Sequence, residues 1–294
     1  MYKSGFVTII GRPNVGKSTL LNFIIGEKVS IISDKPQTTR NKIQCVYTQN
    51  DFQIVFIDTP GIHKPKNKLD EYMMNISKST LNEVDVVTFM VDNSKRIGPL
   101  DENIISQLRG VRTPKILVIN KIDKLSKEDI AEIMDTYRRL NMFDDIIPIS
   151  AMNGTNVALY IDVLKRMLPE GPQYFPEDMI TDQPERFIIA EIIREKALHY
   201  LEEEVPHGVF VAIDMINTRD DKDIIDVHAT IYCEKESHKG IIIGKNGRKL
   251  KGIGKSARID IENLLGSQVN LQLWVKVEKN WRDKENKIKY FGYE

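Results

Sequence analysis

The chain has 294 residues, and its 42 lysines and arginines are balanced by 42 aspartates and glutamates. This balance excludes a global electrostatic pull toward nucleic acid or an anionic membrane, so any such attraction has to be local. The length is sufficient for two domains, each with its own hydrophobic core.

The cysteines and the apolar runs indicate the compartment. Cys45 and Cys233 lie far apart, in no metal-ligand spacing, which predicts reduced thiols. No apolar run reaches the roughly 20 residues that a membrane-spanning helix needs. The first ten residues lack the pattern of a secretory signal. We therefore expect a cytoplasmic protein.

The first part of the chain alternates strand-like apolar runs with helical patterns. This rhythm is typical of βαβ units and predicts an α/β domain with a mostly parallel six-stranded sheet, covered by helices on both faces. The apolar runs occupy residues 6–10, 52–58, 86–92, 115–120 and 146–150, and the helical patterns occupy 17–25, 68–81, 100–110, 127–140 and 156–168.

A proline-rich segment follows, with prolines at positions 169, 172, 176 and 184. Clustered prolines are typical of connections between domains. We expect a first domain over residues 1–170, a linker over 171–184 and a second domain over 185–294.

The second domain has a different rhythm. A helical pattern over residues 186–205 is expected to stop at Pro206, because proline breaks helices. Strand patterns at 208–216, 227–234 and 269–277, a helical segment before residue 244 and a helical pattern at 248–266 complete an α-β-β-α-α-β order for this smaller α+β domain. The last fifteen residues form a basic tail that contains aromatic residues.

The segment GRPNVGKS, at residues 11–18, follows a strand and opens a helix, as a phosphate-binding P-loop does. Its backbone N–H groups are expected to bind phosphate, with Lys17 at the β- and γ-phosphates and the Ser18 hydroxyl on Mg²⁺. A tight strand-to-helix turn without function is the weaker alternative. The predicted nucleotide contacts of this segment are Gly11, Asn14, Val15, Gly16, Lys17, Ser18 and Thr19.

Two further loops follow predicted strands at the same edge of the sheet. Asp58 ends one strand and is expected to hold Mg²⁺ through water, while the Gly61 N–H reaches the γ-phosphate. Alone, this DTPG segment would be an ordinary turn. The NKID segment supplies Asn120, Lys121 and Asp123 after another strand.

The NKID segment predicts the base. One carboxylate, that of Asp123, can accept both the N1–H and the N2–H of guanine, whereas adenine would leave it unpaired. The site should therefore prefer GTP or GDP over adenine nucleotides. Ser150, Ala151 and Met152 follow the next strand, and the Ala151 N–H is expected to reach guanine O6.

This ordered set of loops resembles the GTPase superfamily over roughly the first 170 residues. The resemblance implies a threonine that binds Mg²⁺ only with GTP. Thr38 and Thr39 are the candidates, and Thr39 is favoured because it directly precedes an arginine. Whichever of the two threonines does not bind Mg²⁺ would simply be a polar residue that precedes a strand. The expected metal ligands are Ser18, Thr39 and Asp58, and the expected catalytic groups are Lys17, Thr39, Gly61 and Asn14.

One departure from the superfamily pattern concerns hydrolysis. Ile62 occupies the place where Ras-like proteins have a water-orienting glutamine, and an isoleucine cannot bond water. Slow intrinsic hydrolysis is therefore expected. Asn14 matches an asparagine that helps some such GTPases bind K⁺ near the phosphates, and K⁺ could replace an arginine finger. Asn14 as a loop-capping side chain is the equal alternative.

The second domain contains GKNG at residues 244–247 between two helical segments, which is no second P-loop because no Lys-Ser/Thr pair follows it. With the α-β-β-α-α-β order, it resembles a type II KH domain, whose GxxG loop binds single-stranded RNA. Seven basic residues and no acidic one lie between 237 and 259. The predicted RNA contacts are Gly244, Lys245, Asn246, Gly247, Arg248, Lys249 and Lys251.

A P-loop GTPase domain joined to a type II KH domain resembles the Era family, and QTTRNKI, EEEVPHG and the segment around GKNG extend the likeness over nearly the whole chain. The resemblance implies binding to small-subunit (16S) ribosomal RNA near its 3′ end, a role in small-subunit assembly, a monomeric state and a loose association with the inner membrane face. The alternatives are a metabolic P-loop kinase or ATPase, an RNA-binding module with a catalytically dead G domain, and another assembly or tRNA-modifying GTPase of the same superfamily.

Overall fold

The computed structural model of the chain describes residues 1–33, 35, 37–62, 65–219 and 223–293. Two compact units are present. The first comprises Met1–Ile32, Thr39–Pro65 and Asp70–Asp182, and the second comprises Ser33–Thr38, Lys66–Leu69 and Gln183–Glu294. Residues 171–182 of the predicted linker thus group with the first unit. The boundaries that we expected for the domains, after residues 170 and 184, remain predictions.

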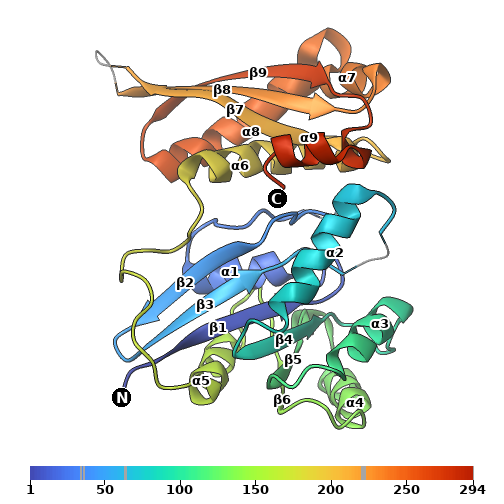
Figure 1. Ribbon diagram of the computed structural model, residues 1–294, viewed down its shortest axis with the longest axis vertical. Coiled ribbons are helices and arrows are strands. Elements are labelled where there is room, and N and C mark those ends of the chain that lie inside the picture. The colour runs from blue at the N-terminus through green and yellow to red at the C-terminus, as the bar shows by residue number, and fades with distance from the viewer. Residues whose placement is uncertain (34, 36, 63–64, 220–222, 294) are drawn as a thin grey trace. The chain divides into compact units, whose positions relative to one another are not determined.

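A six-stranded sheet forms the centre of the first unit (Figure 1). Its strands run in the order β2-β3-β1-β4-β5-β6. Strand β2 pairs antiparallel with β3 and the other pairings are parallel, which confirms the predicted mostly parallel sheet. The bounds are β1 (Lys3–Ile10), β2 (Ile43–Gln49), β3 (Phe52–Asp58), β4 (Val86–Val91), β5 (Lys115–Ile119) and β6 (Asp145–Pro148).

Helices cover both faces of this sheet. On one face Phe89 of β4 belongs to a core cluster with Ile104 of α3 and Tyr137 of α4. Its neighbour Thr88 points to the opposite face, where its hydroxyl lies 2.7 Å from that of Tyr160 on α5. The bounds are α1 (Lys17–Ile25), α2 (Lys68–Thr80), α3 (Pro99–Leu108), α4 (Lys127–Arg138) and α5 (Val157–Met167), with a 3₁₀ turn η1 (Ile122–Lys124).

The chain after α5 runs along the free edge of strand β2. The Val46 N–H donates to the Ile180 carbonyl at 2.9 Å, and the Thr181 hydroxyl donates to the Gln44 carbonyl at 2.8 Å. The Asp182 carboxylate accepts from the Gln44 N–H at 3.1 Å. This segment therefore satisfies backbone groups that an edge strand would otherwise leave unpaired.

The second unit packs three helices against a three-stranded sheet of order β7-β8-β9 (Figure 1). Strand β8 is antiparallel to β7 and parallel to β9. The elements follow the predicted α-β-β-α-α-β order: α6 (Glu185–Tyr200), β7 (Phe210–Thr218), β8 (Ile224–Cys233), α7 (Glu236–Ile243), α8 (Arg248–Leu265) and β9 (Gln268–Val277). The 3₁₀ turns are η2 (Pro206–Gly208), η3 (Lys245–Gly247) and η4 (Trp281–Asp283).

Apolar spacing in α8 positions the basic loop before it. Ile253, Ala257 and Ile261 are fully buried in the core of the second unit, and Leu250 and Leu264 are partly buried against it. This is the apolar face predicted from the sequence. Lys251, Lys255 and Arg258 are exposed outside this apolar face of α8.

The predicted end of the first helix in this unit was wrong. Helix α6 ends at Tyr200, and Leu201 is extended and buried, several residues before Pro206. Three glutamates follow at 202–204, and acidic residues are unfavourable at the negative end of a helix dipole. Hydrophobic packing of Leu201 and this charge run stop the helix before the proline does.

The tail that sequence reasoning left without structure is folded. It contains η4 and helix α9 (Glu285–Tyr290). Trp281 is fully buried, its indole N–H donates to the Gly208 carbonyl at 2.9 Å, and Phe291 stacks on Phe210 with ring centroids 4.1 Å apart. Across the described ranges, no helix is long and apolar enough to cross a membrane.

Candidate functional site

The P-loop turns sharply from β1 into α1. Gly16 has φ of +106° and Asn14 has φ of +66°, both in the left-handed region. A Cβ on Gly16 would lie 2.3 Å from the Asn120 amide nitrogen, and one on Gly11 would lie 2.4 Å from the Met90 carbonyl oxygen. Only glycine fits at both positions, so the glycines allow the loop to pack against β4 and the NKID segment.

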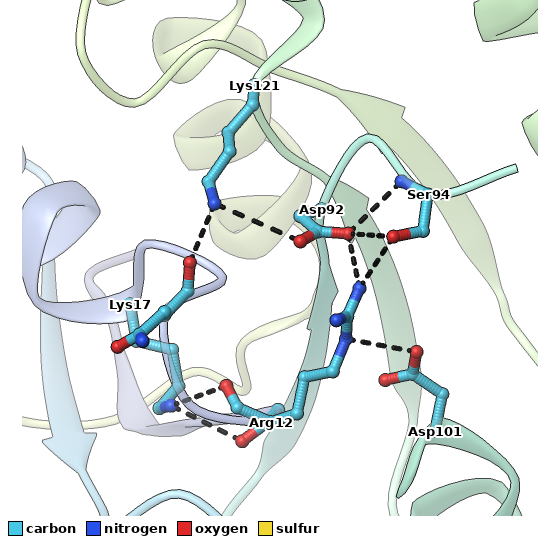
Figure 2. A network of polar contacts seen from close by, with 8 residues as sticks. Arg12, Lys17, Asp92, Ser94, Asp101 and Lys121 are labelled. Atoms are coloured by element: carbon cyan, nitrogen blue, oxygen red, sulfur yellow. Dashed lines mark hydrogen bonds and ion pairs between the residues drawn. The ribbon is translucent and has the colours of Figure 1, made fainter. Parts of the chain in front are cut away.

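Lys17 begins α1 and its ammonium lies inside the loop (Figure 2). Its Nζ donates to the carbonyls of Gly11 and Arg12, each at 3.3 Å. Burial lowers the pKa of Lys17, and the nearby Asp58 carboxylate opposes that shift. The ammonium is thus held at the helix N-terminus, where a phosphate would also meet backbone N–H groups.

A buried carboxylate and three hydroxyls lie beside the P-loop. The Ser18 hydroxyl donates to Asp58 Oδ2 at 3.3 Å and lies 3.5 Å from the Thr39 hydroxyl. The Ser30 hydroxyl donates to the same Asp58 oxygen at 2.7 Å. Burial raises the pKa of Asp58, and the charge of Lys17 is the main opposing influence.

The second oxygen of this carboxylate, Asp58 Oδ1, is buried and has no hydrogen-bond partner among the residues that the structure describes. A buried acceptor without a partner is unfavourable unless a cation or water meets it. An oxygen-rich cluster of this kind suits Mg²⁺. Ser30 is the member that sequence reasoning missed, because no motif spacing marks it.

The two candidate threonines have different surroundings. The Thr38 hydroxyl donates to the Lys35 carbonyl at 2.6 Å, which is a local turn contact. Thr39 is buried with its hydroxyl beside Ser18. Of the two, Thr39 is therefore the one whose side chain lies at the Asp58 cluster.

Asn120 connects three loops. Its side-chain N–H donates to the Val15 carbonyl at 2.7 Å, and its side-chain oxygen accepts from the Ala151 N–H at 2.9 Å. The Ala151 N–H that we expected at guanine O6 thus bonds to Asn120 in this structure. Lys121, with φ of +66°, donates through Nζ to the Asn14 carbonyl at 2.7 Å (Figure 2).

The predicted base-reading carboxylate is oriented by a serine. Asp123 accepts from the Ser150 hydroxyl at 2.6 Å, and the same hydroxyl oxygen accepts from the Asn153 N–H at 3.3 Å. Asp123 is exposed, as a group that meets a ligand has to be. Met152, at 79 % exposure, leaves the edge of this loop open.

The DxxG segment places its glycine against the P-loop. A Cβ on Gly61 would lie 3.2 Å from Pro13, so a side chain there would press on the loop. Ile62 is only 4 % exposed and packs in the core cluster. The residue that stands in the glutamine position therefore points away from solvent and cannot orient a water molecule.

The GKNG segment of the second unit forms a tight turn between α7 and α8. Gly244, Asn246 and Gly247 have φ of +71°, +53° and +73°. A Cβ on Gly244 would lie 2.8 Å from that of Lys249, whereas the space beside Gly247 is open. Lys245, Asn246 and Arg248 line the outside of the turn, and Asn246 is among its exposed residues, so the turn presents polar and charged groups outward.

A groove of about 510 Å³ lies next to this turn, between α8 and β9. Its walls are basic on the helix side and apolar on the strand side. Its lining residues are Leu250, Lys251, Gly254, Lys255, Arg258, Leu271 and Leu273. Before the turn, Ile242 is buried and Ile243 partly buried in the core of the second unit, while Ile241 is exposed.

Comparison with known proteins agrees with this geometry. A family model described as "50S ribosome-binding GTPase" matches residues 6–121, and one described as "KH domain" matches residues 204–282. The chain is 64 % identical over 293 residues to the GTPase Era of Alkaliphilus oremlandii, covering 100 % of this chain and 99 % of that protein. It is 63 % identical over 294 residues to GTPase Era of Clostridioides difficile, with the same coverage.

Solved structures show the same fold over the full length. A point variant of Aquifex aeolicus Era bound to GDP·AlF₄⁻ superposes with a TM-score of 0.95 at 44 % identity, covering 99 % of each chain. Era in complex with MgGDPNP and nucleotides 1506–1542 of 16S ribosomal RNA gives the same TM-score and identity, covering 100 % of this chain and 99 % of that one. Since such likeness extends over the whole of both chains, the protein belongs to the GTPase Era family.

Proposed function

We propose that this chain binds and hydrolyses GTP with its first unit, binds 16S ribosomal RNA near the 3′ end with its second unit, and acts in assembly of the small ribosomal subunit. The observation that carries the proposal is the convergence of the P-loop, Asp58, Thr39 and the NKID segment at one edge of the sheet. A relative at 44 % identity has been solved with MgGDPNP and nucleotides 1506–1542 of that RNA.

Guanine selection is assigned to Asp123, and phosphate binding to Lys17 and the backbone of residues 11–19. Ser150 holds the Asp123 carboxylate in place before a base arrives, so little ordering is required on binding. A competition assay with GTP, ATP and xanthosine triphosphate tests this assignment. We expect GTP to be preferred over ATP. Asp123→Asn should lose that preference, because an amide presents one acceptor oxygen and one NH₂ donor where the carboxylate presents two acceptor oxygens. Equal affinities of the wild type for GTP and ATP would refute it.

Mg²⁺ is expected at Ser18, Thr39 and Asp58, and the support is the buried Asp58 Oδ1, for which no described residue is a partner. When bound, it neutralises charge on the β- and γ-phosphate oxygens. Thr38→Ala and Thr39→Ala form a matched pair of variants. Since only Thr39 lies beside Ser18, Thr39→Ala should weaken the Mg²⁺ dependence of GTP binding while Thr38→Ala leaves it close to wild type. The reverse outcome would assign the role to Thr38.

Hydrolysis is expected to be slow without a partner, because the buried Ile62 has no polar group that could orient water. We assign to Asn14 the binding of K⁺ next to the phosphates. Its support is its place in the P-loop at φ of +66°, where Lys121 already bonds its carbonyl and orients the residue. Equal GTPase rates in K⁺ and Na⁺ for the wild type and Asn14→Ala would remove this role.

RNA is assigned to the GKNG turn and the groove between α8 and β9. Exposed Lys251 and Lys255 supply charge for phosphates, and Leu271 and Leu273 form an apolar wall against which bases can pack. Lys251→Ala and Lys255→Ala are suitable variants because both side chains are exposed and outside the core. Substitution of Gly244 would instead strain the turn.

The test is the salt dependence of binding to an RNA with the sequence of nucleotides 1506–1542. Each lost phosphate contact should lower the slope of log affinity against log salt by about 0.7, the value for single strands. Lys289→Ala, an exposed lysine on α9, is the matched control and should not change it. An unchanged slope for both groove variants would place the RNA elsewhere.

GTP and RNA are expected to affect each other's binding. The segments around Thr39 and after Gly61 order with the γ-phosphate in GTPases, and this ordering can bias a second site. Thermodynamic reciprocity then requires that RNA raise GTP affinity by the factor by which GTP raises RNA affinity. Equal GTP affinities with and without the RNA would show two independent sites.

We further propose that the protein is cytoplasmic, monomeric and loosely associated with the inner membrane face. The support is family membership for the first, and only the resemblance noted above for the other two. Sedimentation equilibrium tests the monomeric state, and flotation with vesicles of an anionic lipid tests the membrane association. A dimer, or absence of the protein from the floated fraction at low salt, would overturn the corresponding proposal.

A further inference from the structure

The side chain of Arg12, in the P-loop, lies between two carboxylates, those of Asp92 and Asp101 (Figure 2). Its Nη2 donates to Asp92, which directly follows β4, and to the Ser94 hydroxyl at 2.9 Å. Its Nε lies 3.1 Å from Asp101 Oδ2, in the first turn of α3. One guanidinium thus joins the P-loop to two other elements of the first unit.

The Asp101 carboxylate makes this arrangement specific. Its side chain is 2 % exposed, against 25 % for Arg12. Burial raises the pKa of Asp101, and the charge of Arg12 is the main opposing influence. A buried carboxylate is unfavourable without a cation beside it, so the position of Asp101 in α3 fixes where the guanidinium has to lie.

The main chain of Arg12 serves the phosphate lysine. Its carbonyl, with that of Gly11, accepts from Lys17 Nζ. An anchored Arg12 side chain therefore limits the movement of the carbonyls that aim the Lys17 ammonium. Fixing a backbone before the ligand arrives lowers the ordering cost of binding.

Asp92 contacts a second cation of the site. Its other oxygen lies 3.9 Å from Nζ of Lys121, whose nearer partner is the Asn14 carbonyl at 2.7 Å (Figure 2). Asp92 therefore faces both Arg12 at the start of the P-loop and Lys121 of the guanine-selecting segment. Neither carboxylate belongs to the motifs that mark the nucleotide site in the sequence.

We propose that Arg12 is a positioning residue for phosphate binding, held by Asp101 and Asp92. Asp92 is then a shared anchor, because it contacts both Arg12 and Lys121 and so fixes the position of the P-loop relative to the NKID segment. This inference rests on the proposed nucleotide site. In this proposal Arg12 acts through the backbone of the P-loop and not by contact with a phosphate. Its effect is on the placement of Lys17 and therefore on the affinity for the β- and γ-phosphates rather than for the guanine base.

The variants are Arg12→Gln, which removes the charge, and Arg12→Lys, which keeps the charge but can meet only one carboxylate at a time. Arg138→Gln is the matched control, because Arg138 is an exposed arginine paired with Asp135 on α4. Affinities for GMP, GDP and GTP are measured by competition on the full chain. The unfolding midpoint of each nucleotide-free variant is measured in parallel.

We expect Arg12→Gln to weaken GDP and GTP binding about 10-fold, which corresponds to about 1.4 kcal/mol. GMP affinity should change much less, because GMP has no β-phosphate for Lys17 to meet. Arg12→Lys should lie between Arg12→Gln and the wild type, and Arg138→Gln should match the wild type. A purely structural role would lower the unfolding midpoint but leave the ratio of GDP to GMP affinity unchanged.

Asp92→Asn tests the shared anchor through a double-mutant cycle with Arg12→Gln. The two changes should be less than additive, since each removes the same ion pair. An unchanged GDP to GMP ratio in Arg12→Gln, or additive effects in the cycle, would overturn the inference while leaving the GTP site intact. Should Arg12→Gln fail to fold, Arg12→Lys decides by the same ratio. Failure of the wild type to bind GTP would instead overturn the proposed function.

Discussion

Asn120→Ala should destabilise the first unit even before any nucleotide is bound. The side chain of Asn120 satisfies two buried backbone groups, the carbonyl of Val15 and the N–H of Ala151. Its removal leaves both without their partner, and each unsatisfied buried group costs about 1–3 kcal/mol, so the expected loss is about 2–6 kcal/mol. The P-loop and the loop after β6 would also separate, and GTP affinity should fall.

Urea unfolding of the nucleotide-free protein measures this loss, and the positions of the tryptophans provide an internal control. Trp274 and Trp281 both lie in the second unit, so tryptophan fluorescence follows that unit alone. Far-ultraviolet circular dichroism follows both units. Asn120→Ala should move the circular dichroism transition to lower urea and leave the fluorescence transition in place.

Two further variants test whether the loss of stability comes from the hydrogen bonds of Asn120. Asn103→Ala, an exposed asparagine on α3, should stay within about 0.5 kcal/mol of the wild type. Asn120→Asp keeps the acceptor for the Ala151 N–H but directs a carboxylate oxygen at the Val15 carbonyl, so it should destabilise the unit as well. If Asn120→Ala unfolded at the wild-type urea concentration and bound GTP normally, the assignment of Asn120 as a connecting residue would be refuted.

Three more substitutions test other parts of the structure. Burial raises the pKa of the Asp58 carboxyl above its usual 3.8. The folded protein therefore keeps the carboxyl proton to a higher pH than the unfolded chain does. As a result, the free energy of unfolding should fall as the pH rises above 3.8. Asp58→Asn should remove this pH dependence and stabilise the nucleotide-free protein, while it weakens Mg²⁺-dependent GTP binding. A steeper fall of stability with pH in the variant would contradict the direction of the pKa shift. Gly16→Ala should abolish GTP binding, because its Cβ would collide with the Asn120 amide at 2.3 Å and φ is +106°; wild-type affinity in a competition assay would show that the loop adapts. Ile253→Ala removes a fully buried side chain of the second unit and should lower the free energy of unfolding by about 2–5 kcal/mol. The tryptophan fluorescence transition should therefore occur at a lower urea concentration. A loss below about 1 kcal/mol, close to that of a surface substitution, would mean that the core refills the cavity.

Local patterns in the sequence predicted the order of the elements well. The P-loop, the strand that ends at Asp58 and the apolar face of α8 all follow from spacing within one element, because glycine geometry and side-chain periodicity act over a few residues. The end of α6 was wrong because proline was the visible stop signal, while the burial of Leu201 and the adjacent glutamates acted first. The fold of the tail depends on the packing of Trp281 against Gly208 and Phe210, which are distant in sequence.

The sequence by itself determined the order of elements, the phosphate loop and the choice of guanine over adenine, since each rests on residues within a short segment and on the chemistry of their side chains. Only the tertiary structure decided that Thr39 rather than Thr38 lies at the Asp58 cluster, that Ser30 completes that cluster, and that Arg12 is held by Asp92 and Asp101. The contacts within the cluster and around Arg12 join residues that are far apart in the chain, and the folding of the sheet and its helices brings them together. No local pattern encodes which distant side chain fills a given space.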